Sequence, residues 1–351
     1  MKSLNSEYIL KQPITHNLLQ TIRRIGEYKG KQDLYKEQSP QILETLRQTA
    51  VIQSTESSNR LEGITAPQER IRELVARKTT PRNRSEQEIT GYRDVLNTVH
   101  GNYSEIPFTT GIILQFHRDL FQFFPSQGGK WKPADNEITE ILPDGTRNIR
   151  FYPLSAHLTL EAMETLHKNY TELRQSGEIE PLLLISTYIL DFLCIHPFLD
   201  GNGRMARLLT LLLLYKSGYE VGRFISLEQM VEQTKEGYYE TLYNSSQGWH
   251  DMRHNILPWW EYFLGVMLFG TYQEFERRVG LVASGRGTKT AMVLDAIGHF
   301  RGDFTIRELQ ELCPNVGIDL IRRILRSQRN TGKLECLGRG PTAAWRNRQS
   351  T

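Results

Sequence analysis

The sequence predicts a mainly α-helical fold with one β-hairpin and a small C-terminal domain. Three observations predict it. Apolar residues recur at helical spacing through most of the chain, one Asp-Gly turn joins two short alternating runs, and the pattern changes after a Gly- and Ser-rich stretch at 280–290. With 351 residues, of which 39% are hydrophobic, the chain can bury the cores of two or three domains.

The N-terminal region is expected to hold a long helix. Ser39-Pro40 is a good N-cap and N1 pair, and apolar residues follow it at helical spacing. The helix should occupy about 40–62, because Gly63 supplies the left-handed conformation that commonly ends a helix.

More helices follow. A second should begin near Ser85, with Glu88 three residues on as the partner in a capping box, and run through His100. Four others are indicated by apolar or amphipathic segments at 109–124, 157–175, 180–195 and 203–218.

One hairpin interrupts the helices. Asn136–Leu142 and Arg147–Tyr152 flank the turn Pro143-Asp144-Gly145-Thr146, which is a strong hairpin signal. A hairpin with no sheet to join is either a surface decoration or a flap over a site.

The last segment has the pattern of a winged helix. Residues 280–290 are expected to form a linker. After it we expect helices at 291–300, at 306–313 capped by Thr305, and at 319–330 after a break at 314–317, then wing strands at 333–337 and 343–345 joined by 338–341.

Basic residues gather in this last segment. From Thr288 to Thr351 there are 11 Lys or Arg and 6 Asp or Glu, whereas the whole chain has a net charge of +3. A DNA surface is therefore expected on the helix that carries Arg322, Arg323, Arg326 and Arg329. A winged helix that binds protein is the alternative.

Composition and sequence pattern also exclude membrane proteins, disulfide-stabilised proteins and thiolate zinc proteins. The N-terminus has no apolar leader, and the most apolar stretches are short or interrupted by polar residues, so we expect a cytoplasmic protein without membrane contact. Three cysteines without C-x-x-C spacing indicate neither a disulfide framework nor a thiolate zinc site.

The segment from His196 to Arg207 carries the chemistry. Gly201-Asn202-Gly203 can point successive N–H groups inward at the start of a helix, which makes an anion-binding nest. Arg204 and Arg207 lie on neighbouring positions of that helix and can hold a polyphosphate.

Two further residues complete this site. Asp200 is an oxygen ligand suited to Mg²⁺, and His196 can accept a proton from an attacking hydroxyl. Taken singly, such a histidine, turn or arginine pair is usually structural, whereas together in twelve residues they indicate a phosphate site. A resident metal centre is a weaker interpretation, since no third ligand stands nearby.

This segment resembles the Fic motif H-x-F-x-[D/E]-G-N-G-R-x-x-R at every specified position. The resemblance covers roughly 65–275. It implies transfer of AMP from ATP to a protein hydroxyl, with His196 as general base, Asp200 as Mg²⁺ ligand and Phe198 as a packing residue. It also implies that Gly201 to Gly203 form the anion nest, that Arg204 and Arg207 grip the phosphates, and that the flap 136–152 aligns the target protein by strand addition.

Two more groups of residues enter through the resemblance. Ser58-Asn59-Arg60-Leu61-Glu62-Gly63 fits the family's inhibition motif [S/T]-x-x-x-E-[G/N], and Glu62 could pair with Arg207; a solvated Glu before a C-cap Gly is the alternative. Tyr238, Tyr239 and Asn244 stand where relatives contact adenine, although a Tyr-Tyr pair in a helix is more often core packing.

The predicted organisation is an N-terminal helical region over 1–66, a Fic domain over 67–280 and a winged helix over 286–351. Other functions remain open at this point. The chain could be a DNA-binding regulator that uses the Fic domain as a nucleotide sensor, or an enzyme that removes AMP or transfers another phosphate-containing group. A homo-oligomer is also left open.

Overall fold

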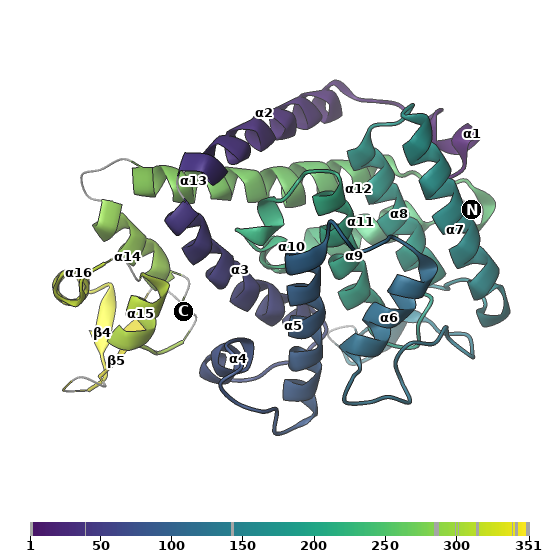
Figure 1. Ribbon diagram of the computed structural model, residues 1–351. Coiled ribbons are helices and arrows are strands. Elements are labelled where there is room, and N and C mark those ends of the chain that lie inside the picture. Colours follow the sequence, from purple (N-terminus) through teal and green to yellow (C-terminus); the bar gives the residue numbers. More distant parts are fainter. Residues whose placement is uncertain are drawn as a thin grey trace. The chain divides into compact units, whose positions relative to one another are not determined.

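The computed structural model describes residues 3–38, 40–141, 144–283, 288–298, 300, 302–313, 316–338, 340 and 343–348 (Figure 1). Contacts divide the chain into two compact units. The first comprises residues 1–30 and 50–272, and the second comprises 31–49 and 273–351. The divisions fall within helices α2, α3 and α13.

Helices make up most of the first unit. Its α-helices in chain order, including those shared with the second unit, are α1 (Ser6–Ile9), α2 (His16–Gln38), α3 (Pro40–Leu61), α4 (Gln68–Val75), α5 (Arg84–Asn102), α6 (Thr110–Leu120), α7 (Thr159–Ser176), α8 (Pro181–Ile195), α9 (Asn202–Lys216), α10 (Leu227–Gln233), α11 (Lys235–Ser246), α12 (Leu257–Glu261) and α13 (Gly270–Ala283). Short 3-10 turns lie at Ala156–Leu158, Val221–Arg223 and Trp249–Asp251, and a π-helix spans Tyr262–Phe269.

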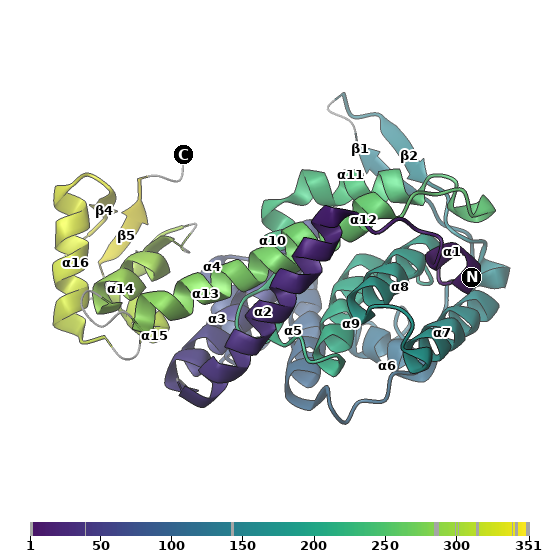
Figure 2. The ribbon, with the colours of Figure 1, turned by 90° about the horizontal axis from the view of Figure 1, so that it is seen from above.

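Helices α8 and α9 form the centre of this unit. Every residue of α8 after Pro181 is buried, and so is nearly all of α9. They pack on each other and are enclosed by α5, α6, α7 and α12 (Figure 2). Because both helices are fixed on nearly all sides, the loop that joins them has little freedom to move.

The hairpin is confirmed. Strand β1 (Ile138–Ile141) pairs in antiparallel fashion with β2 (Arg147–Phe151), with an irregularity between Ile138 and Thr139. Asp144 accepts hydrogen bonds from the backbone and hydroxyl of Thr146, as expected for an Asp-Gly turn. Leu142 and Pro143 lie outside the described residues.

The long N-terminal helix is also confirmed, since α3 runs to Leu61 and Gly63 follows with φ of 76°. Ser39, its expected cap, lies outside the described residues. The capping box at Ser85 and Glu88 was wrong. Asn83 caps α5 through a hydrogen bond from the Glu86 N–H, and Glu88 instead accepts side-chain bonds, because an asparagine two residues earlier offers the cap first.

Two other boundaries differ from the expectation. Helix α6 ends at Leu120, so residues 121–123 form a turn rather than a last helical turn. The linker at 280–290 was drawn too wide, because α13 reaches Ala283 and α14 begins at Thr288. Residues 284–287 lie outside the described residues.

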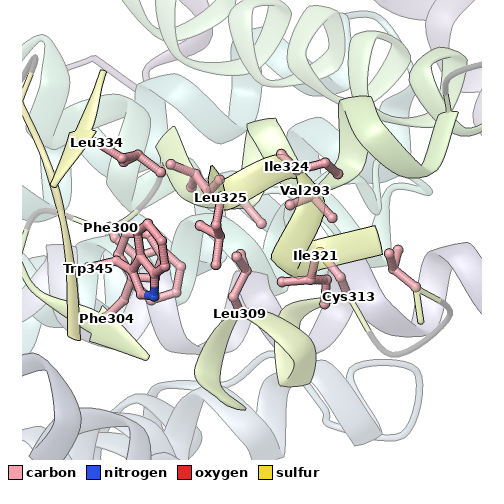
Figure 3. Packing of buried hydrophobic residues seen from close by; sticks show 13 residues of the cluster. Val293, Phe300, Phe304, Leu309, Cys313, Ile321, Ile324, Leu325, Leu334 and Trp345 are labelled. Atoms are coloured by element: carbon pink, nitrogen blue, oxygen red, sulfur yellow. The ribbon is translucent and has the colours of Figure 1, made fainter. Parts of the chain in front are cut away.

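The second unit ends in a small domain with its own core. Its elements are α14 (Thr288–Gly298), β3 (Phe304–Thr305), α15 (Ile306–Leu312), α16 (Ile318–Asn330), β4 (Leu334–Cys336) and β5 (Ala344–Asn347), and the strands lie in the order β3-β5-β4. Figure 3 shows Leu309, Leu325 and Trp345 among the side chains that fill this core.

The boundaries in this domain agree closely with the sequence pattern. Thr305 forms the predicted capping box with Glu308, and the helix expected from Asp319 begins one residue earlier. Pro314 and Asn315 of the predicted break and Arg339 and Pro341 of the predicted turn lie outside the described residues. None of the described helices is long and apolar enough to cross a membrane.

Candidate active site

The loop between α8 and α9 turns twice through the left-handed region. His196 caps α8 with φ of 51°, a conformation that non-glycine residues seldom adopt. Gly201 has φ of 81°, and a β-carbon there would collide with the ring of Phe121. The loop is thus confined to one path between two buried helices.

Phe198 anchors this loop in the core. Its ring is fully buried and stacks on the His117 imidazole, with 3.6 Å between ring centroids. Its backbone N–H donates to Asn202 Oδ1 at 3.0 Å, and Asn202 Nδ2 donates back to its carbonyl at 2.7 Å. The Asn202 side chain therefore closes the loop by binding both backbone groups of Phe198.

His117 is a residue that sequence reasoning missed. The Gly129 N–H donates to its Nδ1 at 3.0 Å, so the ring proton must sit on Nε2, which donates to the Asp200 carbonyl at 3.0 Å. Burial lowers the pKa of His117 to about 4, although the bond to Asp200 opposes this shift. A neutral imidazole thus holds the backbone of Asp200.

The imidazole of His196 is suited to accept a proton. Its Nδ1 lies 3.2 Å from the carbonyl oxygen of Leu193, which can only accept, so Nδ1 carries the hydrogen and Nε2 keeps its lone pair. Burial lowers the pKa of His196 to about 4, and the charge of Lys132 adds to this, while Glu62 and Asp200 oppose it. The ring is therefore neutral at physiological pH.

Arg204 is deeply buried, with 1% of its surface exposed. Its Nη1 donates to Glu88 Oε2 at 2.8 Å, and Nη2 lies 3.6 Å from Asp200 Oδ1. Glu88, on α5, gave no sequence signal for this role because 116 residues separate the pair. The two carboxylates leave Arg204 charged and fixed beside the start of α9.

Arg207 meets the predicted inhibition motif. Its Nε donates to Ser58 Oγ at 2.8 Å, and its Nη2 donates to the Ser58 carbonyl at 2.9 Å and to Glu62 Oε1 at 2.7 Å. Burial would raise the pKa of Glu62, but the charge and hydrogen bond of Arg207 outweigh it and lower that pKa below its usual value. Glu62 is thus a carboxylate.

The Glu62 carboxylate also lies against the first turn of α9. A β-carbon on Gly203 would collide with Glu62 Oε1 and come within 3.2 Å of Arg207 Nη1. Gly203 is thus the position where only a hydrogen lets an anion reach the helix N-terminus. Glu62 occupies the place that the sequence assigned to a phosphate.

The end of α3 is held from a second side, which sequence reasoning also missed. Glu232, on α10, accepts hydrogen bonds from Ser57 Oγ at 2.7 Å and from Arg60 Nη1 at 3.0 Å. One turn earlier, Ser54 Oγ donates to Ser226 Oγ at 2.9 Å. These bonds fix the helix that presents Glu62.

The three residues proposed to contact adenine differ in how far they are buried. Tyr238 is buried and packs among Trp259 and Tyr262. Tyr239 is half-buried, and its hydroxyl lies 3.5 Å from the Leu61 carbonyl. Asn244 is exposed on α11. Tyr239 thus contacts the inhibitory segment.

The hairpin is tied to the same region. Arg150, on β2, donates to Glu140 at 2.8 Å and to the Tyr239 carbonyl at 3.4 Å. After β2, the Leu154 N–H donates to the Cys194 carbonyl at 3.3 Å, two residues before His196. The segment after β2 is therefore bonded to the end of α8, just before His196.

The residues present fit a magnesium ion that arrives with phosphate. The Asp200 side chain is 59% exposed, and its Oδ1 accepts a hydrogen bond from the Gly201 N–H at 2.5 Å. Proteins commonly hold Mg²⁺ through one or two carboxylates, with phosphate and water as the other ligands. Within the described ranges, no group of three or more His, Cys, Asp or Glu forms a metal site.

Comparison with known proteins gives a consistent result. Residues 107–214 match the Fic/DOC family, a range that begins just before α6 and ends within α9. The chain is 25% identical over 224 residues to Protein adenylyltransferase Fic of Drosophila grimshawi and 26% identical over 227 residues to that of Drosophila yakuba. These alignments cover 61% of this chain but only 44% and 43% of the two relatives, so the chain spans less than half of their length.

Solved structures share the fold. A Fic family protein from Desulfovibrio desulfuricans superimposes with a TM-score of 0.61 at 20% identity and covers 95% of this chain and 97% of its own. A Fic domain containing signaling protein from Bacteroides thetaiotaomicron gives 0.57 at 22% identity, over 73% of this chain and 95% of its own.

Proposed function

The chain contains a domain of the Fic/DOC family, and from this premise we propose that it is a protein adenylyltransferase that Glu62 holds in an inhibited state. The single observation that carries the proposal is the arrangement around His196, where an imidazole with an available Nε2 precedes Asp200, the helix N-terminus at Gly203 and the guanidinium of Arg207. The adenylyltransferase names of the Drosophila relatives support it.

The reaction follows from these groups. A Tyr, Ser or Thr hydroxyl of a target protein attacks the α-phosphorus of ATP, the bond from that phosphorus to the bridging oxygen breaks, and pyrophosphate leaves. His196 Nε2 accepts the proton of the attacking hydroxyl. The N–H groups at the start of α9, together with Arg204 and Arg207, stabilise the charge that develops on the phosphate oxygens.

Asp200 would hold Mg²⁺, with the phosphates supplying further ligands. When bound, the ion would neutralise part of the phosphate charge. The His117 imidazole fixes the carbonyl of Asp200 at 3.0 Å, so the backbone that carries this carboxylate is positioned before any ligand binds.

Inhibition follows from competition for Arg207. The Glu62 carboxylate takes the guanidinium and lies over Gly203, where a terminal phosphate would bind. ATP must then bind without the interaction between Arg207 and its terminal phosphate, and its α-phosphate is misplaced relative to the attacking hydroxyl. Tyr239 and Asn244 are proposed to contact adenine, and the hairpin to align the target segment by strand addition.

Intact-mass spectrometry tests the proposed function. Purified Glu62→Gly protein is incubated with ATP and Mg²⁺, either alone or with a cell extract as the source of targets. The mass added to the protein is then measured. An added AMP on a protein is expected, and Glu62→Gly combined with His196→Ala should show none. Loss of AMP from a pre-modified target, or a different added group, would instead identify a Fic enzyme with another reaction.

A second candidate function is DNA binding by the C-terminal domain, with the Fic domain as a nucleotide sensor. The order of its elements, with three helices and a hairpin, supports a winged helix. Helix α16 buries Ile321, Ile324 and Leu325 and exposes Arg322, Arg323, Arg326 and Arg329. The last three of these arginines form no ion pair with any residue that the structure describes, so their charge is available for phosphates.

Fluorescence anisotropy with a labelled DNA duplex tests this candidate on the full chain. Arg323→Glu with Arg326→Glu should weaken binding at least about tenfold, and the wild-type affinity should fall steeply with salt. Arg346→Gln is the matched control, because that exposed arginine is already neutralised by two bonds to Asp303. Equal affinity of all variants, or no salt dependence, would exclude DNA and favour a protein partner.

A further inference from the structure

A buried lysine connects the two sides of His196. Lys132 is 3% exposed. Its ammonium donates to the carbonyl of Ile195 at 3.0 Å, and its backbone N–H donates to the carbonyl of Pro197 at 2.8 Å. One residue, 64 positions earlier in the chain, therefore binds the carbonyls of the two residues that flank the histidine.

Asn136 extends this support. The Lys132 ammonium also donates to Asn136 Oδ1 at 2.9 Å, and Asn136 Nδ2 donates to the Phe198 carbonyl at 2.9 Å. The segment 132–136 thus binds the carbonyls of residues 195, 197 and 198. His196 is the residue in this stretch whose carbonyl it leaves alone.

The histidine needs such support for two physical reasons. Its left-handed backbone is a conformation of higher energy, which persists only where surrounding bonds hold it. The last carbonyls of α8 also lack helical partners and carry the negative end of the helix dipole, so a cation at Ile195 is favourable there. Lys132 satisfies both requirements.

The charge of Lys132 acts on the imidazole as well. The charged groups that face His196 are Lys132, Glu62 and Asp200, and of these only Lys132 disfavours the imidazolium. Burial lowers the pKa of Lys132 itself to about 8, with Asp135 opposing the shift. Lys132 therefore carries a positive charge at neutral pH.

We propose that Lys132 is a positioning residue for the reaction: its bonds fix the backbone on both sides of His196 and so direct Nε2 at the substrate hydroxyl, and its positive charge disfavours protonation of the ring. Its kinetic consequence rests on the proposed function. Its effect on the imidazole rests on the position and charge of Lys132 and is measurable without any substrate.

The first test is an NMR titration of the histidine ring nitrogens in the wild-type protein, with His196 assigned by the signal lost in His196→Ala. Lys132→Met should raise the midpoint of the His196 titration, whereas Lys132→Arg should leave it close to the wild-type value. Lys130→Met is the matched control, since Lys130 is exposed two residues away. An unchanged midpoint in Lys132→Met would overturn the proposal.

The second test measures AMP transfer against pH in the Glu62→Gly background. Lys132→Met should lower kcat/KM by about 10- to 100-fold and move the acid limb of the profile to higher pH, and Lys132→Arg should restore both. A purely structural role would lower the rate without moving the limb, which contradicts the proposal. If Lys132→Met does not fold, Lys132→Gln keeps a donor without the charge and should move the limb in the same direction.

The two tests separate the possible failures. If the Glu62→Gly protein transfers no AMP, the proposed function fails, and the NMR titration still decides the role of Lys132. If that protein is active and both readouts ignore Lys132, only the inference about Lys132 fails.

Discussion

Glu62 and Arg207 form an ion pair of 2.7 Å between the end of α3 and the second turn of α9, and Ser58 accepts two further bonds from the same guanidinium. On the proposed function, Arg207 reaches ATP only when this set of bonds is released. The pair therefore predicts how nucleotide binding responds to changes in α3.

The first prediction concerns ATP affinity. Both Glu62→Gly and Glu62→Gln should tighten ATP binding at least about tenfold, because the charge-assisted bond to Arg207 is lost and the guanidinium becomes available. Isothermal titration calorimetry with His196→Ala in the background avoids turnover. Glu69→Gln, an exposed change on α4, is the control. Equal affinity in all four proteins would refute competition for Arg207.

A second prediction concerns Glu232, which holds Ser57 and Arg60 from α10. Glu232→Ala should raise AMP transfer, but less than Glu62→Gly does, because α3 loosens without losing its carboxylate. When Glu232→Ala is combined with Glu62→Gly, it should raise AMP transfer little further, since both changes release the same pairing of Glu62 with Arg207. Glu236→Ala on the exposed face of α11 serves as the control. Additive effects of the two changes would show that Glu232 acts elsewhere.

The acid limb of the reaction gives a third prediction. A general base must be unprotonated, and the pKa of His196 is lowered to about 4. Removing Glu62 takes away a carboxylate that raises this pKa, so the Glu62→Gly enzyme should keep most of its kcat/KM between pH 7 and 5. A half-loss of kcat/KM near pH 6.5, measured with a fixed excess of Mg²⁺, would mean that the imidazole is solvated.

A fourth prediction concerns stability against pH. Burial lowers the pKa of both His117 and His254 to about 4 from the usual value of 6.5. The unfolded chain then binds more protons between these values, so stability is complete above pH 6.5 and falls as the pH drops toward 4. Each histidine should lower the free energy of unfolding by about 2 kcal/mol at pH 5. Urea denaturation from pH 7 to 4.5 measures this.

A fifth prediction concerns the buried pair of Arg204 and Glu88. Removing Glu88 leaves the buried charge of Arg204 with only the largely exposed Asp200 carboxylate at 3.6 Å, so Glu88→Ala should destabilise the protein by about 3–5 kcal/mol. Glu137→Ala, at an exposed ion pair on the hairpin, should cost about 1 kcal/mol or less. Equal losses in chemical denaturation would show that Arg204 finds another partner.

Local sequence predicted what depends on neighbouring residues. The Asp-Gly hairpin, the loop from His196 to Arg207 and the Thr305 cap are each encoded within a few positions, so their patterns were readable. So were the helices expected between residues 85 and 218, whereas the 23-residue helix α2 was not predicted. The cap of α5 was misread because Ser85 and Glu88 imitate a capping box that Asn83 supersedes. Pattern alone does not rank two competing caps so close together.

The supports of the site were beyond sequence reasoning. His117, Lys132 and Glu88 come from other elements and meet the loop only through tertiary packing. Neither a charged residue in an amphipathic helix nor a lysine in a loop reveals its distant partner. The pairing of Glu62 with Arg207 was predicted because the family resemblance, and not the helical pattern, placed it there.

On the proposed function, the Arg207 guanidinium both binds Glu62 and binds ATP, and this double use limits how the protein can change. A substitution of Arg207 would remove the restraint and the nucleotide grip together, so a permanently active form cannot arise at that position. Permanently active descendants must instead alter α3 or its attachment to α10. Any cellular ligand that draws α3 aside would have the same effect reversibly, and abundant ATP would itself oppose the restraint by mass action.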